Sequence, residues 1–330
     1  MQRSYAHIGV VGSGAWGTAL AVLANRAGTR TTLFTRNDYV MESVLSTRMN
    51  AAYLPDVFLD PAIAITANMA ELSSCDIIII TIPAQSLRTV MISISDLASS
   101  STPIVLATKG IERGSLLLMS EVVQSIMPSN PQAVLSGPNF ASEAAAGLPT
   151  ATVLATHHSG VADALSYLLG GKYFRMYTND DPLGTQMGGA LKNVLAIACG
   201  IAMGRGLGEN ARAALITRGL AEIARLARAK GGKEETLMGL AGLGDVMLSC
   251  SSPKSRNYAL GVQIGMQGHY VKQANASLHE GVATADSAYH LAQKLGVQVP
   301  VVNAVYDVLR GASSIDSAIE QLLDRAVLAE

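Results

Sequence analysis

The sequence predicts an α/β protein in which residues 1–181 form a doubly wound parallel sheet and residues 182–330 form an all-α domain. Three observations carry this prediction. A glycine-rich turn joins a strand pattern directly to a helix pattern near the N-terminus. Strand and helix patterns then alternate up to Asp181. Beyond Pro182, no segment has a convincing strand pattern, and the periodic segments have helical spacing.

Length and composition agree with a large globular protein. A chain of 330 residues has a prior of about two domains, and 49% hydrophobic with 15% charged residues is ample for large cores. The net charge of −1 argues against a general affinity for nucleic acid. Three cysteines far apart fit reduced thiols in a cytoplasmic protein, and the six histidines have no metal-ligand spacing. We therefore expect no metal site.

The N-terminus runs into a strand pattern without the apolar stretch of a signal peptide. The most apolar segments are short, or carry Lys192 and several glycines, so we expect no membrane insertion.

The predicted sheet rests on short apolar runs. Residues 77–82 are β-branched and apolar on both faces, as in parallel strands covered on both sides. The region from Asp38 to Leu59 is expected to be mostly helix and loop. The expected strands are Ala6–Val11, Thr31–Phe34, Ile63–Thr66, Ile77–Ile82, Pro103–Ala107, Ala133–Leu135 and two late edge strands, Ala151–Ala155 and Phe174–Tyr177. The expected helices of the second domain are Gly184–Met203, Asn210–Arg228, Gly281–Leu295 and Asn303–Leu309.

The glycine-rich turn contains Gly12, Gly14 and Gly17. Such glycines permit a tight turn, close approach of the backbone to a pyrophosphate, and close packing of helix on strand. The helix that follows offers free N–H groups and the positive end of its dipole. Because the motif lies between a strand and a helix, it favours a Rossmann-like dinucleotide site over an ordinary turn.

The end of the second strand bears on the choice of cofactor. Arg36 occupies the neighbourhood where an acidic residue would contact the ribose hydroxyl of NAD, which points to the 2′-phosphate of NADP. Asp38 lies slightly further on and keeps NAD open, and a solvated loop arginine is the other interpretation. The cofactor is therefore expected to be NADP(H), NAD(H) or both.

Lys192 is the only charged residue in the apolar segment 184–203. A lysine inside such a helix must reach water or have its pKa lowered. Its neighbours Gly188, Gly189 and Ala196 are small, so we expect room for another molecule to approach the amine. Taken alone, the segment favours the other interpretation, a lysine that only extends to solvent from a helix whose glycines permit close packing.

Other polar groups follow strands or begin helices. Lys109 lies just after a strand, where ligands of open α/β sheets bind. The turn Gly137-Pro138-Asn139 follows another strand, and Ser255-Arg256-Asn257 could hold a phosphate or simply start a helix. Asp245 could orient a lysine or a substrate hydroxyl, or cap a helix.

Together these motifs resemble those of bacterial NAD(P)-dependent glycerol-3-phosphate dehydrogenases, and the resemblance runs nearly end to end. The motifs that carry it are Gly-Ser-Gly-Ala-Trp-Gly (12–17), Ala-Thr-Lys-Gly (107–110), Ser-Gly-Pro-Asn-Phe-Ala (136–141), Gly-Gly-Ala-Leu-Lys-Asn-Val (188–194), Asn-Ala-Arg-Ala-Ala-Leu-Ile-Thr-Arg-Gly (210–219), Gly-Leu-Gly-Asp (242–245) and Ser-Arg-Asn (255–257). Several such motifs in the right order are far more specific than any one alone.

The resemblance implies a reaction and a set of roles. Hydride would pass reversibly between sn-glycerol 3-phosphate and dihydroxyacetone phosphate, in support of glycerophospholipid synthesis, in a cytoplasmic homodimer. Lys192 would be the general acid and base. The implied substrate residues are Lys109, Gly137, Asn139, Lys192, Asp245, Ser255, Arg256 and Asn257. The implied cofactor residues are Gly12, Gly14, Ala15, Trp16, Gly17, Arg36, Lys109, Ala141, Arg256, Leu278 and Glu280.

Two positions depart from the commoner pattern of the family. Asn139 stands where threonine or serine is usual, and His279 stands where valine is usual, before Glu280 and Gly281. The alternatives are a dehydrogenase of the 6-phosphogluconate or hydroxyisobutyrate type, which shares the two-domain plan, and a nucleotide-sensing regulator without activity. A regulator needs no buried lysine and usually carries a binding module that this sequence lacks.

Overall fold

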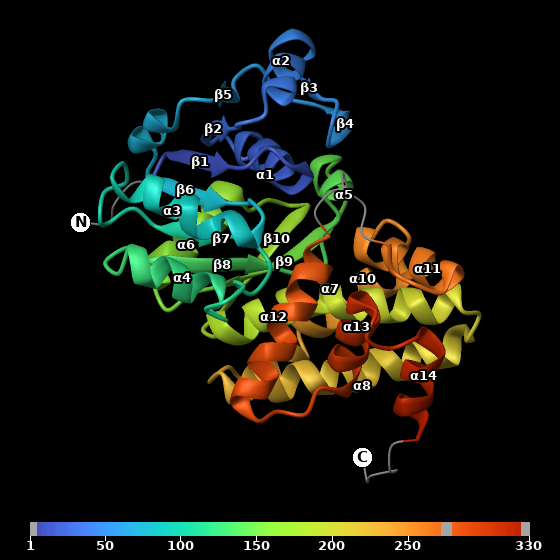
Figure 1. Cartoon of the computed structure of the whole chain (residues 1–330). Helices are drawn as coiled ribbons and strands as arrows, with labels where there is room; N and C mark the ends of the chain where they lie inside the picture. The colour runs from blue at the N-terminus through green and yellow to red at the C-terminus, as the bar shows by residue number, and fades with distance from the viewer. Residues whose placement is uncertain (1–4, 272–278, 325–330) are drawn as a thin grey trace.

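The computed structural model describes residues 5–271 and 279–324. Its first part is built on an eight-stranded sheet with the order β10-β9-β8-β7-β6-β1-β2-β5 (Figure 1). The strands of this sheet are β1 (His7–Val11), β2 (Arg30–Phe34), β5 (Ala64–Thr66), β6 (Ile77–Ile80), β7 (Ile104–Leu106), β8 (Gln132–Ser136), β9 (Thr150–Ala155) and β10 (Phe174–Asn179). The helices of this part are α1 (Ala15–Arg26), α2 (Asp38–Thr47), α3 (Leu87–Ser95), α4 (Met119–Ile126), α5 (Ala141–Ala145) and α6 (Ser159–Leu169), with 3-10 turns η1 (Met69–Ser74) and η2 (Ala84–Ser86).

The central strands explain why the sheet is doubly wound. All four isoleucines of β6 are 0% exposed. Ile77 and Ile79 join one core with α1 and α6, whereas Ile78 and Ile80 join a second core with α3 and α4. Because side chains alternate along a strand, a continuous apolar run requires a cover on both faces. The predicted fold class is therefore confirmed.

Two local predictions in this part are wrong. The segment after α2 forms a small antiparallel hairpin of β3 (Met49–Asn50) and β4 (Leu54–Phe58), where no strand was expected in a region of mostly helix and loop. Strand β9 is not an edge strand, because it pairs antiparallel with β8 and parallel with β10. The chain returns directly from β8 to β9 past the short α5, whereas α6 makes the crossover that sets β10 parallel to β9.

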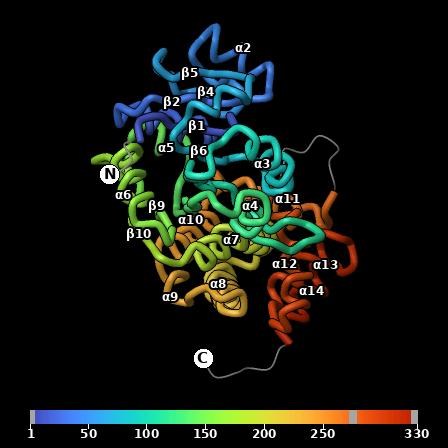
Figure 2. Tube along the Cα trace, turned by 90° about the vertical axis from the view of Figure 1, so that its left-hand side faces the viewer, coloured from blue at the N-terminus to red at the C-terminus, as the bar shows by residue number. Residues whose placement is uncertain are grey.

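Every regular element after Asp181 within the described residues is helical, as the sequence predicts. Figure 2 shows these helices from a second side. They are α7 (Pro182–Gly204), α8 (Gly208–Ala229), α9 (Glu234–Leu237), a π-helical turn η3 (Leu240–Gly244), α10 (Asp245–Ser251), α11 (Arg256–Gln267), α12 (Glu280–Leu295), α13 (Pro300–Arg310) and α14 (Ile315–Leu323).

Helix α7 lies between the sheet and α8 (Figure 1). It contacts β8 and β9 on one side and α8, α10, α11 and α12 on others. In the part of the chain that the structure describes, it alone is long and apolar enough to cross a membrane, but 89% of its most apolar window is buried inside the protein. The same length and hydropathy suit a core helix, and its packing makes it one.

The start of α7 is fixed by Asp181, which is 5% exposed. Its Oδ1 accepts a hydrogen bond from the backbone N–H of Gly184 at 2.9 Å, as an N-cap does. Its Oδ2 accepts from the backbone of Lys233 and the hydroxyl of Thr236, at 2.8 and 2.7 Å. One carboxylate therefore joins the end of the sheet region to α7 and α9. A domain boundary between 181 and 182 stays a prediction.

Helices α7 and α11 cross at bare glycine backbones. A Cβ added to Gly200 would lie 2.2 Å from the carbonyl oxygen of Tyr258, and one added to Gly261 would lie 2.2 Å from that of Ile197. Backbone atoms at such distances cannot move aside as a flexible side chain can. The crossing therefore requires glycine on both helices.

We predict that Gly200→Ala destabilises the protein by about 1–3 kcal/mol or more, because the added methyl separates two packed helices. The matched control is Gly160→Ala in α6, where an added Cβ meets nothing within 4 Å. That change should be neutral or slightly stabilising, because alanine is the better helix former. Urea unfolding of both variants measures the difference, and equal stability would contradict the packing argument.

Candidate functional site

The centre of the candidate site is the carboxylate of Asp245, which is 0% exposed. Its Oδ2 accepts a hydrogen bond from Lys109 Nζ at 2.6 Å, and its Oδ1 accepts one from Lys192 Nζ. Lys109 follows β7, Lys192 lies in α7, and Asp245 is the first residue of α10. The amine of Lys192 thus faces a buried carboxylate, and its side chain is only 11% exposed.

Burial acts most strongly on Lys109. Loss of water lowers the pKa of its amine to about 8, with the charge of Asp245 opposing this shift and that of Lys192 adding to it. Two cations share one carboxylate, so the cluster carries an excess positive charge when both amines are protonated. This arrangement suits a site that holds an electron-rich oxygen and exchanges a proton.

Two of the small residues near Lys192 serve close packing, as the second interpretation of this segment held, and do not leave room for another molecule. A Cβ on Gly188 would lie 2.4 Å from the carbonyl oxygen of Ala241. A Cβ on Gly189 would lie 2.7 Å from Ser136 Oγ and 3.5 Å from Lys109 Cδ. The protein itself fills this space, because these glycines let the other elements of the site approach α7.

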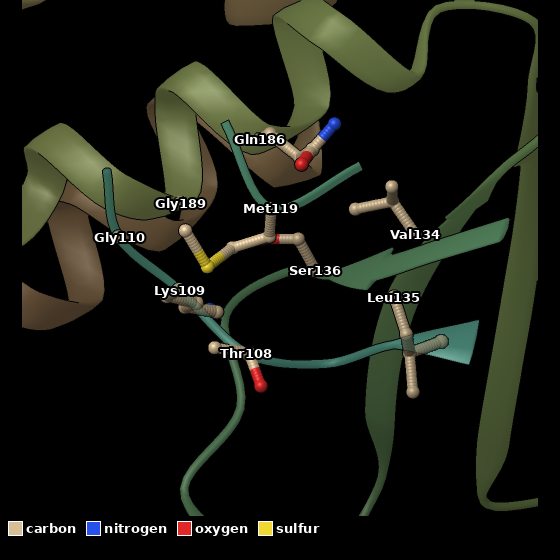
Figure 3. Close-up of a pocket in the computed structure, with 9 residues that line it drawn as sticks. All are labelled: Thr108, Lys109, Gly110, Met119, Val134, Leu135, Ser136, Gln186 and Gly189. Atoms are coloured by element: carbon tan, nitrogen blue, oxygen red, sulfur yellow. The ribbon is translucent and has the colours of Figure 1, made fainter. Parts of the chain in front are cut away.

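A small pocket lies beside this contact (Figure 3). Its lining includes Lys109, Ser136, Gln186 and Gly189. The cavity volume is about 10 Å³, enough for about one water molecule and too small for a metabolite. We therefore do not assign it to the substrate.

The π-helical turn η3 places Asp245, and sequence reasoning missed it. Gly242 packs against the backbone of Leu237, where an added Cβ would lie 2.1 Å from the carbonyl oxygen. The glycines in Gly-Leu-Gly-Asp at 242–245 are the only sequence signal for such a turn. Turns of this rare type often occur at functional sites.

The Ser-Arg-Asn motif begins α11. Ser255 is its N-cap, with Oγ accepting from the backbone N–H of Tyr258 at 3.4 Å. Asn257 Oδ1 accepts from the backbone N–H of Gly281 at 3.2 Å, which joins the N-terminus of α11 to that of α12. Arg256 is exposed and forms no ion pair or hydrogen bond with any residue the structure describes. Its guanidinium is therefore available to an anion.

Glu280 opens α12 next to this motif. Burial raises the pKa of its carboxyl to about 7, with a backbone hydrogen bond from Ala84 and the charge of Arg256 opposing. Burial and then Arg256 lower the pKa of His279. Glu280 Oε2 lies 3.7 Å from where Gly110 would carry a Cβ, so it reaches the loop that bears Lys109. Leu278 lies outside the described residues.

Residues 137–141 follow β8. Gly137 packs against β9, since an added Cβ would lie 3.0 Å from Thr152 Cα. The side-chain amide of Asn139 donates to the carbonyl oxygen of Ala151 at 2.8 Å. Ala141 begins α5, which contacts α1. These contacts show structural roles, and the ligand contacts of these three residues stay predictions.

The glycine-rich turn has the three features expected of a pyrophosphate site. Gly12 has φ +112°, which favours glycine. A Cβ on Gly17 would lie 1.9 Å from the carbonyl oxygen of Gly12, whereas one on Gly14 meets nothing within 4 Å. No side chain caps α1, which begins with Ala15 and Trp16. A dinucleotide therefore fits this turn, with room beside Gly14 and free N–H groups in the first turn of α1.

Hydrogen bonds connect this turn to Lys109 along the carboxyl edge of the sheet. The hydroxyl of Thr81 donates to the carbonyl oxygens of Val11 and Gly12, at 3.0 and 2.9 Å. The hydroxyl of Thr108 donates to the carbonyl oxygen of Ile82 at 2.9 Å. The turn and the lysine cluster therefore lie at the same edge, because β1, β6 and β7 are parallel.

Arg36 follows β2, is exposed, and forms no ion pair with the residues placed by the structure. Asp38 lies in the first turn of α2.

Asn50, a residue that sequence reasoning missed, is 0% exposed, and its Nδ2 donates to Ser13 O and to Thr18 Oγ1, both at 2.8 Å. No local pattern indicates this role, because it depends on the β3–β4 hairpin.

No cluster of potential metal ligands occurs within the described ranges.

Comparison with known proteins gives the same picture over the whole chain. Models of the NAD-dependent glycerol-3-phosphate dehydrogenase family match residues 7–162 for the N-terminus and 181–320 for the C-terminus. The glycerol-3-phosphate dehydrogenase (NAD(P)+) of Caulobacter vibrioides is 46% identical over 330 residues and covers 99% of both chains. That of Rhodospirillum rubrum is 46% identical, over 100% of this chain and 95% of its own.

A solved structure agrees with these relatives. The glycerol-3-phosphate dehydrogenase of Coxiella burnetii is 39% identical and superposes with a TM-score of 0.92, over 97% of this chain and 99% of its own. Both halves of the chain, the order of its motifs and its fold thus lead to one assignment. The chain belongs to the NAD-dependent glycerol-3-phosphate dehydrogenase family.

Proposed function

We propose that this chain catalyses the reversible transfer of hydride between sn-glycerol 3-phosphate and dihydroxyacetone phosphate, with NADP(H) or NAD(H). The observation that carries the proposal is the buried Asp245 carboxylate that binds both Lys109 and Lys192 at the sheet edge of the glycine-rich turn. Family membership and the names of the relatives support it. The nicotinamide, when bound, exchanges the hydride.

The protein then supplies orientation and a proton. Lys192 gives a proton to the C2 oxygen during reduction and takes it back during oxidation. Lys109 holds the same oxygen with a second positive charge, which stabilises the charge that develops as hydride arrives. Asp245 keeps both amines in place because each bonds a different oxygen of one carboxylate.

The remaining residues of the proposed site contact either the substrate or the cofactor. Ser255, Arg256 and Asn257 bind the substrate phosphate at the N-terminus of α11, where the helix dipole also favours an anion. Gly137 and Asn139 line the substrate site. The cofactor residues are Gly12, Gly14, Ala15, Trp16, Gly17, Arg36, Lys109, Ala141, Arg256, Leu278 and Glu280.

The cellular setting of the proposal rests on resemblance to the family. The enzyme acts in the cytoplasm as a homodimer and supplies glycerol 3-phosphate to phospholipid synthesis. It inserts into no membrane and binds no nucleic acid. Residues 1–181 form the dinucleotide-binding domain and residues 182–330 the substrate-binding domain, and each domain contributes residues to both ligands. Reduction of dihydroxyacetone phosphate, assayed against 6-phosphogluconate and hydroxyisobutyrate oxidation with each cofactor, tests the substrate assignment.

We predict that Lys192→Ala lowers kcat for dihydroxyacetone phosphate reduction by about 100- to 10,000-fold, because the acid that protonates the C2 oxygen is lost. Cofactor binding, measured by titration of protein fluorescence, should stay nearly intact. The control is Lys230→Ala, which also removes a largely buried lysine with a carboxylate partner, Glu121, at 2.5 Å. Unchanged turnover in Lys192→Ala would refute its catalytic role.

We predict that Arg256→Ala lowers kcat/KM for dihydroxyacetone phosphate by about 10- to 100-fold, because a charge-assisted contact to phosphate is lost. The much slower reduction of dihydroxyacetone, which has no phosphate, should change little. Arg175→Ala, which removes an exposed arginine of β10, is the control. An equal loss with both substrates would show that Arg256 acts only through the cofactor and does not recognise the substrate phosphate.

We predict that kcat/KM for reduction falls as the pH rises through about 8. The pKa of Lys109 lies near that value, so its amine is charged below it and neutral above it. Lys109→Arg keeps its charge beyond pH 12, so any activity that remains should lose this limb of the profile. Rate measurements from pH 7 to 9.5 test this, and an unchanged fall in the variant would assign the limb to another group.

A further inference from the structure

Two hydroxyl groups link the glycine-rich turn to the end of β2. Ser13 Oγ and Thr35 Oγ1 lie 2.5 Å apart, and the two residues are 7% and 2% exposed. Ser13 lies between Gly12 and Gly14, and Thr35 directly precedes Arg36. This buried hydrogen bond is therefore a direct contact between the segment suited to a pyrophosphate and the segment that bears the free arginine.

Each hydroxyl belongs to a residue that is fixed on other sides. The carbonyl oxygen of Ser13 accepts from Asn50 Nδ2 at 2.8 Å. The backbone N–H of Thr35 donates to Thr66 O at 2.9 Å. Thr35 Oγ1 also accepts from the backbone N–H of Asn37 at 3.1 Å. The Thr35 hydroxyl therefore holds the backbone on both sides of Arg36, through its bonds to Ser13 and to Asn37.

Arg36 itself is left free by this arrangement. Asn37 is tied to α2, where its Oδ1 caps the backbone N–H of Val40 at 3.2 Å. Arg36 is exposed and lacks an ion-pair partner across residues 5–271 and 279–324, its near neighbour Asp38 included. Its backbone is held on both sides, while its guanidinium bonds none of the residues that the structure describes.

We propose that the Ser13–Thr35 hydroxyl pair positions Arg36 for the 2′-phosphate of NADP(H) and thereby sets the preference between the two cofactors. This inference rests on the proposed function. The pyrophosphate and the 2′-phosphate belong to one ligand, so they can be bound together only if their two protein segments keep a fixed separation. The hydroxyl pair maintains that separation directly. NADH lacks the 2′-phosphate, so its binding does not depend on this separation.

The test compares two threonine-to-valine variants, one at Thr35 and one at Thr32 in the preceding strand. Thr35→Val removes the hydroxyl that bonds both Ser13 and the backbone N–H of Asn37, with little change of shape. Thr32→Val in β2 is the matched control, because Thr32 is also buried and its hydroxyl bonds His7 Nε2 at 2.9 Å, away from Arg36. Thr35→Ser keeps the hydroxyl. The dissociation constants of NADPH and NADH are measured for each full-length variant by fluorescence titration.

We expect Thr35→Val to weaken NADPH binding by about 3- to 10-fold relative to NADH, which is less than the loss of a whole charge-assisted contact because Arg36 is displaced and not removed. Thr32→Val should lower thermal stability without changing the ratio of the two affinities, and Thr35→Ser should restore that ratio. A purely structural role would instead weaken both cofactors equally in Thr35→Val. That outcome overturns the proposal.

A double variant shows whether Thr35 acts through Arg36. Arg36→Ala alone should reduce the preference for NADPH, and adding Thr35→Val should then change the ratio no further. A second, equal fall in the double variant overturns the proposal. Failure of the proposed function is distinguishable, because the unaltered protein would then bind neither cofactor or would not reduce dihydroxyacetone phosphate.

Discussion

The structure depends on one buried carboxylate shared by two lysines. Asp245 is fully buried, and an unpaired charge in that position would be strongly destabilising. Removing one partner of a buried ion pair typically costs about 3–5 kcal/mol. The end of β7, the middle of α7 and the start of α10 must therefore meet at this point. The same contact that brings the sheet against the helices also fixes the two amines to which we assign the reaction.

This constraint explains the composition of α7. The helix has to fill an apolar core, carry Lys192, and admit other backbones at close range. Gly188 receives the backbone of Ala241, Gly189 receives Lys109 and Ser136, and Gly200 receives α11. Small residues in α7 thus serve contacts within the protein. At these positions the helix contains glycine, a poor helix former, because close packing requires it, and this is the interpretation that the segment alone favours.

Local pattern predicted much of the fold and few of the contacts within the site. The isoleucines of β6 predict a parallel sheet covered on both faces, because their burial needs only the strand period. The β3–β4 hairpin escaped prediction, since β3 has two residues and Pro55 interrupts the next segment. The π-helical turn before Asp245, the role of Asn50 and the Ser13–Thr35 bond depend on residues distant in sequence. The lysines and the glycine-rich turn were identifiable from their motifs, but their common carboxylate required the fold.

The cations of the site divide into two groups with different chemistry. Lys109 and Lys192 are engaged by Asp245, and lysine is the cation whose pKa responds to burial, as that of Lys109 does. Arg36 and Arg256 are exposed and without ion-pair partners in the described chain, each beside a helix N-terminus. Arginine stays charged at any working pH and matches a phosphate with two donors. The proposed reaction needs both kinds of cation. Proton exchange requires an amine whose protonation state can change, whereas binding two phosphorylated ligands requires cations that stay charged.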